Sequence, residues 1–152
     1  MMTTRFFSAR HKAIVCACAL LLTGSAVGAR SATAEVAIGE IDARAASGDK
    51  ELAKLFEKSV AQELSRLDLS HAKSKDRYLL SATLVSVGTR RARAGESAKA
   101  EVSAILRRAR GGELHAVLRG SASTAEASED ARRAVVRGAV RSALRRVPEA
   151  LR

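Results

Sequence analysis

The spacing of apolar residues changes along this chain, and each change predicts a different kind of element. Between residues 50 and 67 apolar residues recur every three or four positions, which is typical of an amphipathic helix. Between residues 78 and 123 they alternate with polar residues in three segments, which is typical of strands. The helical spacing returns after residue 128. The pattern predicts helix, three strands and a second helix.

Before the first helix, residues 35–41 also alternate and predict a short additional strand. Asp49 stands where a helix N-cap is expected, and Glu51 places an acid in the first turn. The apolar stripe of this helix consists of Leu52, Leu55, Phe56, Val60, Leu64 and Leu67. Because its other faces carry mixed charges, we expect it to pack on a sheet rather than to lie on a membrane.

The first of the three later strands, residues 78–87, has apolar residues on both faces. This predicts a central strand that is covered at least partly on both sides. Val87 is expected on the same face as Leu79. Residues 88–95 contain two glycines and three arginines, and we expect them to form a loop.

The next two strands, residues 98–106 and 113–123, are predicted to form a hairpin around Arg110-Gly111. Gly111 and Gly112 allow the positive φ angles that a tight turn needs. The expected core side chains are Ala100, Val102, Leu106, Leu114 and Leu118. His115 would then point to the opposite, polar face and be exposed.

The second helix has an acidic opening, Ser128 as its expected N-cap, and Pro148 after its expected end near Val147. Its predicted buried stripe consists of Val136, Val140, Ala143, Leu144 and Val147. Small residues such as Gly138 would allow a close approach to the sheet. Arginines recur at every fourth position, namely Arg133, Arg137, Arg141 and Arg145, and form a positive ridge along one side.

Residues 1–34 resemble a secretory signal peptide, with a basic start, a short apolar run and small residues at two cleavage positions. Cleavage is expected after Ala29 or after Ala34, which leaves residues 35–152 as one domain. The competing interpretation is an uncleaved anchor, although the apolar run is shorter than the roughly 20 residues that span a bilayer. Both cysteines lie in the apolar run, so the mature chain would have no disulfide or thiolate metal site.

The chain has a formal net charge of +11. Three of its 27 basic residues and none of its 16 acidic residues lie in the first 29 positions, so the remainder carries +8. This excess favours anionic partners such as acidic lipids or polysaccharides. Nucleic acid is not expected, because export separates the chain from it and aromatic residues for base stacking make up only 3%.

No catalytic or cofactor motif is present in the sequence. Neither His71 nor His115 has a second ligand or a nucleophile at a useful spacing, so a hydrolase is the least favoured interpretation. The paired glycines lack the spacing of a phosphate-binding loop. We therefore expect a protein without enzymatic activity, cofactor or metal.

The expected fold class is α+β, with a two-layer, four-stranded, mostly antiparallel sheet that carries both helices on one face, in the order β-α-β-β-β-α. This order and the Gly111-Gly112-Glu113-Leu114 hairpin resemble small periplasmic domains of cell-envelope assembly factors, such as the amino-terminal domain of the Tol-system propeller protein or the activators of penicillin-binding proteins. The resemblance implies a non-enzymatic envelope role through protein–protein contacts.

Two functions follow as hypotheses. The first is an exported accessory or protein-interaction domain, in the periplasm or secreted, with an envelope protein as partner and no transmembrane span after cleavage. The alternative is binding of polyanions or anionic membrane surfaces. Its candidate residues are Arg90, Arg91, Arg93, Arg133, Arg137, Arg141 and Arg145.

Overall fold

The computed structural model of the protein describes residues 34–92 and 95–152. The predicted signal peptide, apart from Ala34, and Arg93 lie outside these residues. In chain order the main elements are β1 (Glu35–Asp42), α1 (Lys50–Ser65), β2 (Arg77–Ala92), β3 (Gly95–Arg108), β4 (Leu114–Thr124) and α2 (Glu129–Leu144). A short 3₁₀ helix, η1 (Arg44–Ala46), follows β1, and a single helical turn, α3 (Val147–Ala150), follows α2.

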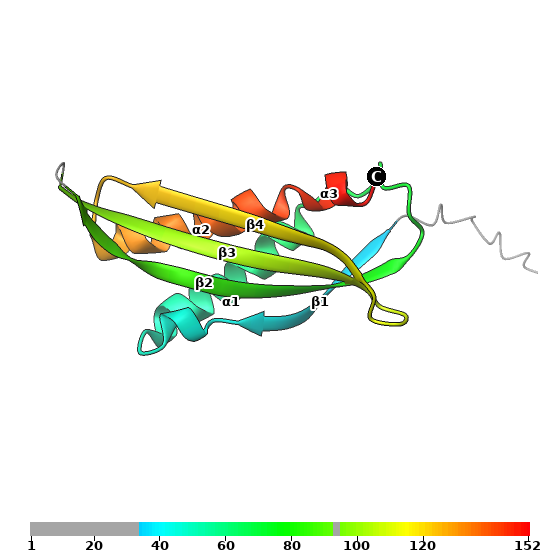
Figure 1. Cartoon of the computed structure of the whole chain (residues 1–152), viewed down its shortest axis with the longest axis horizontal. Coiled ribbons are helices and arrows are strands. Elements are labelled where there is room, and N and C mark those ends of the chain that lie inside the picture. The colour runs from blue at the N-terminus through cyan, green and yellow to red at the C-terminus, as the bar shows by residue number, and fades with distance from the viewer. Residues whose placement is uncertain (1–33, 93–94) are drawn as a thin grey trace, which may run out of the picture. The chain divides into compact units, whose positions relative to one another are not determined.

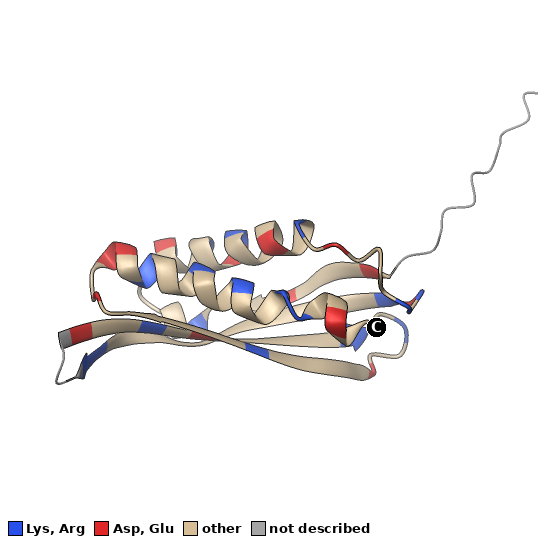
Figure 2. Ribbon diagram, turned by 90° about the horizontal axis from the view of Figure 1, so that it is seen from above, with Lys and Arg blue, Asp and Glu red and all other residues tan. Residues whose placement is uncertain are grey.

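The four strands form one sheet in the order β1-β2-β3-β4 (Figure 1). β1 pairs with β2 in parallel because α1 carries the chain back between them, whereas the hairpin-connected strands β2, β3 and β4 are antiparallel. Both long helices lie over the same face of the sheet (Figure 2). The predicted α+β class, element order and two-layer arrangement are confirmed.

A single apolar layer lies between the helices and the sheet. From α1 it contains Leu52, Phe56 and Val60, each at most 2% exposed. The stripe predicted for the second helix is buried throughout. The sheet contributes Tyr78, Leu80, Ala82, Leu84, Ala98, Ala100, Val102, Ala104, Leu106 and Leu118. Since alanine supplies much of this inner face, the helices must approach the sheet closely to exclude water.

Glycine permits that close approach at one point on β4. A Cβ atom on Gly120 would lie 2.2 Å from the carbonyl oxygen of Ala139 and 2.3 Å from the nitrogen of Ala143, both in α2. On the facing helix, a Cβ atom on Gly138 would lie 2.9 Å from that of Ala122. The expectation that Gly138 allows close packing on the sheet is consistent with this geometry.

Both helices begin where their caps were expected. The side chain of Asp49 accepts a hydrogen bond from the Leu52 amide, and that of Ser128 accepts one from the Ala131 amide. The second helix ends at Leu144, earlier than expected, because Pro148 has no N–H to donate to the Leu144 carbonyl. The chain continues as α3.

The prediction that residues 88–95 form a loop is wrong for most of this segment. Residues 88–92 extend β2 and pair with the beginning of β3, so Arg90 and Arg91 lie on a strand. Cross-strand contacts stabilise the extension: Arg91 pairs with Glu96 at 2.8 Å, and the hydroxyl of Ser97 donates to the Arg90 carbonyl.

At two places in the sheet, one strand has an extra residue relative to its neighbour. Each extra residue turns the residues that follow it to the opposite face, so predicted side-chain directions are reversed there. The shift between Leu84 and Ser86 brings Val87 opposite Ala100, on the helix-bearing face, where it packs against the core. The expectation that Val87 shares a face with Leu79 is therefore wrong.

The second irregularity lies at the start of β4, where Leu106 pairs with Ala116 but Arg107 pairs with Leu114. His115 is the extra residue. Leu114 shares the outer face with Arg107 and is 57% exposed, so its assignment to the core is wrong. His115 is exposed as expected, but it contacts Tyr78 of the buried layer rather than pointing to the outer face.

Candidate interaction surface

The side of the sheet opposite the helices carries no helix in the described part of the chain (Figure 2). The prediction that β2 is covered on both sides is therefore wrong, although β2 is an inner strand. Large apolar side chains remain open to solvent on this outer face. They are Leu79, Val85, Leu114 and Val117, which are between 39% and 57% exposed.

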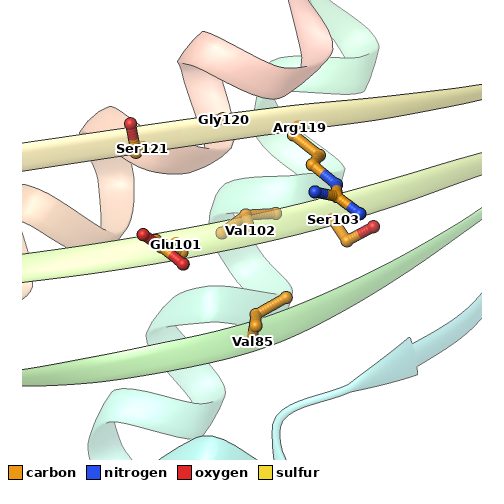
Figure 3. A pocket seen from close by; sticks show the side chains of 7 residues that line it. All are labelled: Val85, Glu101, Val102, Ser103, Arg119, Gly120 and Ser121. Carbon is orange, nitrogen blue, oxygen red and sulfur yellow. The ribbon is translucent and has the colours of Figure 1, made fainter.

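A shallow hollow of about 470 Å³ lies in the middle of this outer face (Figure 3). Val85 of β2, Glu101 and Ser103 of β3, and Arg119 of β4 surround it. Arg119 is the cross-strand partner of Ser103, and its guanidinium extends toward that residue. Strand pairing therefore brings an apolar, an acidic, a hydroxyl and a basic group together from three strands.

The two charged groups of the hollow differ in their partners. Glu101 accepts a hydrogen bond from Lys99 at 2.6 Å, and this contact, more than the nearby charge of Arg119, lowers the pKa of Glu101. Arg119 makes no ion pair among the described residues. The hollow thus offers a guanidinium that can bind a carboxylate or a carbonyl oxygen of another molecule.

In the described residues, the hollow does not bring together the side chains considered for catalysis or metal binding. Among residues 34–92 and 95–152 no three His, Cys, Asp or Glu side chains come together as metal ligands. The two histidines of this part of the chain lie outside the hollow. His71 belongs to the turn after α1, and His115 is at the start of β4.

His115 connects β4 to the C-terminal segment. Its Nε2 atom lies 2.9 Å from the carbonyl oxygen of Ala150, and its ring centroid lies 4.8 Å from that of Tyr78. The Tyr78 hydroxyl in turn donates to Ser74. These contacts give His115 a packing role at the end of the sheet.

The arginines expected to bind anions lie on two different elements. Arg90 and Arg91 are on β2 near the tip of the β2–β3 hairpin, whereas α2 begins beside this tip and runs away from it (Figure 1). Three of the arginines already have acidic partners: Arg91 pairs with Glu96, Arg133 with Glu129 and Arg141 with Glu63. In the described structure Arg137 and Arg145 are exposed and form no ion pair.

A basic cleft that the sequence pattern did not reveal lies at the other end of the sheet. Lys75, Arg77, Arg108 and Arg110 line an open space of about 580 Å³ together with Asp76. These residues come from two short basic segments, residues 73–77 and 107–110. They meet because Tyr78 of β2 pairs with Arg108 of β3. Predicting the register of β2 against β3 would have shown that these two basic segments lie side by side.

No known family model matches this chain, and no curated protein matches it. Among solved structures, the hypothetical protein CT253 from Chlamydia trachomatis is similar, with 14% identity, a TM-score of 0.57, and coverage of 78% of this chain and 98% of that one. The PelC dodecamer from Paraburkholderia phytofirmans is similar at 17% identity and a TM-score of 0.55, covering 80% of this chain and 90% of that one.

These likenesses show that the chain shares the fold of small bacterial α+β proteins. The specific resemblance to the Tol-system propeller domain or to the activators of penicillin-binding proteins is not supported by them. In addition, no helix within residues 34–92 and 95–152 is long and apolar enough to cross a membrane.

Proposed function

We propose that this protein is a non-enzymatic accessory domain of the cell envelope that acts by binding another protein chain. The observation that carries the proposal is the outer face of the sheet, where Leu79, Val85, Leu114 and Val117 stand open to solvent. Apolar side chains gathered on one face of a small domain are typical of interaction sites. The basic start and apolar run of the first 34 residues support export.

The outer face also indicates what kind of partner it would bind. Val85 lines a hollow that also holds the guanidinium of Arg119, which has no ion-pair partner among the described residues. Val117, which is 50% exposed, precedes Arg119 by two positions on β4 and therefore lies on the same face of the sheet. A complementary surface places apolar side chains over the two valines and a carboxylate against Arg119, because a buried guanidinium needs an acceptor. PelC, which shares the fold, assembles as a dodecamer, so a second copy of the chain is one partner of this kind.

The test is site-specific crosslinking in native envelopes. A photoreactive amino acid at Val117 is expected to give a discrete adduct with one envelope protein or with a second copy of the chain. The matched control places the same group at Lys58, an exposed residue of α1 on the opposite side of the sheet. The proposal fails if Val117 gives no adduct, or only the adducts that Lys58 gives.

The alternative function, binding of anionic polymers or membranes through the arginines of α2, is supported by Arg137 and Arg145. Both are exposed and lack an ion pair among the described residues. The partners of Arg133 and Arg141 count against it, because paired guanidiniums contribute less free charge. The vesicle experiment described in the next subsection contains the variant that tests this function.

A further inference from the structure

Three segments that are distant in sequence meet at the end of the sheet that holds the basic cleft. The amide of Glu35, at the start of β1, donates to the Asp76 carbonyl at 3.3 Å. The amide of Ala109, in the turn after β3, donates to the Arg77 carbonyl at 2.8 Å. The start of β1, the loop before β2 and the β3–β4 turn therefore form one continuous surface.

This surface has an excess of positive charge, and its Lys and Arg residues lie at the end of the sheet near the C-terminus (Figure 2). Its basic residues are Lys73, Lys75, Arg77, Arg107, Arg108 and Arg110. Its acidic residues are Glu35, Asp76 and Glu113. All nine side chains are exposed, so their charges act on whatever approaches this end of the protein.

The acidic residues hold two of the arginines in place. Arg77 pairs with Glu35 at 2.9 Å. Arg108 pairs with Glu113 at 3.0 Å and with Asp76 at 3.5 Å. These contacts orient the walls of the cleft.

Lys75 and Arg110, on opposite walls of the cleft, form no ion pair in the described part of the chain. The cleft is therefore lined by two cationic side chains without an ion-pair partner, and by two guanidiniums that ion pairs hold in place. Such an arrangement suits a phosphate group, which accepts several charge-assisted hydrogen bonds at once.

The same end of the sheet is where the N-terminal segment enters the domain. Residues 1–33, which belong to the predicted export signal, precede Ala34 and β1 in the chain. An apolar segment that stays uncleaved would tether this end of the domain to the bilayer.

We infer that the protein rests on anionic bilayers by this end of the sheet, with the cleft between Lys75 and Arg110 holding the phosphate of an anionic lipid headgroup. This site is separate from the outer face proposed to bind protein, and it does not depend on that function. It also differs from the arginine ridge of α2. Each unpaired lysine or arginine near an anionic surface strengthens binding about fivefold, so Lys75 and Arg110 would give the protein a salt-dependent membrane affinity.

The experiment measures co-sedimentation of the exported, processed protein with vesicles of phosphatidylcholine alone or mixed with an equal part of phosphatidylglycerol. We expect binding only to the mixed vesicles and a steep loss of binding as salt is raised. Lys75→Glu/Arg110→Glu is expected to weaken the partition coefficient about tenfold or more. The matched control, Arg137→Glu/Arg145→Glu, changes the net charge equally and is expected to alter binding less than about threefold.

Four results would overturn the inference. Equal losses in both variants would show an effect of net charge alone, and a larger loss in the Arg137/Arg145 variant would assign binding to α2. Failure of the unaltered protein to bind mixed vesicles would remove the site. Shifts of the Lys75 and Arg110 amides with inorganic phosphate, without vesicle binding, would assign the cleft to a soluble anion. Circular dichroism of both variants checks that they are folded.

Discussion

Gly120 of β4 lies directly beneath Ala143 of α2, so close that a Cβ atom on the glycine would be 2.3 Å from the alanine nitrogen. We expect Gly120→Ala to push the helix from the sheet and to lower the free energy of unfolding by about 1–3 kcal/mol. Urea denaturation measures the change. Gly88→Ala is the matched control, because a Cβ atom there meets nothing within 4 Å. Equal effects at the two glycines would contradict this account of the packing.

The N-cap of α2 allows a second test of stability. The Ser128 side chain accepts a hydrogen bond of 3.1 Å from the Ala131 amide, which Ser128→Ala leaves without its acceptor. The loss is expected to cost about 1 kcal/mol of unfolding free energy, whereas Ser128→Asp retains a capping oxygen and should cost little. Thermal and urea unfolding compare the two variants. If both substitutions cost the same, the cap does not stabilise the helix.

Asp42 at the end of β1 provides a prediction about pH. Hydrogen bonds from the Arg44 side chain and then from its backbone amide hold the pKa of Asp42 below its ordinary value of 3.8. Because the folded pKa is the lower one, the contribution to stability is present above the ordinary value and is lost as the pH falls below it. NMR titration should show the pKa of Asp42 rising toward 3.8 in Arg44→Gln.

Asp68 serves as the internal control for this titration. Its pKa is lowered by hydrogen bonds from Ser70 and not by Arg44, so it should not change in the Arg44→Gln variant. A pKa of Asp42 that is equally low with and without the arginine would show that another interaction causes the shift.

The two predicted signal cleavage positions are not equivalent in the folded domain. Ala34 is only 5% exposed and belongs to the buried layer, so cleavage after Ala34 would remove a packed residue. We expect processing after Ala29, with a mature chain that begins at Arg30. Intact mass spectrometry of the exported protein distinguishes the two products. A mature chain that begins at Glu35 would contradict the prediction.

Helix periodicity was sufficient to predict both helices, their caps and the buried stripe of the second helix. In the predicted stripe of the first helix, Leu52, Phe56 and Val60 are buried, whereas Leu55, Leu64 and Leu67 are only partly buried, and Leu67 lies beyond the end of α1 at Ser65. Strand alternation was less reliable, because one extra residue reverses every direction that follows it. The irregularity after Leu84 turned Val87 inward, and the one at His115 turned Leu114 outward. The apolar pattern of a single strand does not reveal either irregularity, because a bulge is defined by how a strand pairs with its neighbour.

The candidate surfaces were harder to predict than the fold. Leu79 and Val85 were read as evidence of a second covering layer, yet they form the open outer face, and periodicity alone does not tell a covered face from an interaction face. The basic cleft depends on the pairing of Tyr78 with Arg108, residues 30 positions apart in the chain. Charge counted along the sequence favoured the regular arginines of α2 over these two short turns.

The contact between Tyr78 and His115 has a spectroscopic consequence. Tyr78 is the only tyrosine, and the chain has no tryptophan, so its ultraviolet emission comes mainly from one buried ring. That ring lies beside an imidazole that touches the C-terminal turn. The protein therefore carries a natural fluorescent reporter at the end of the sheet proposed to meet the bilayer. Movement of the C-terminal turn or of the basic loop before β2 would change its emission without any added label.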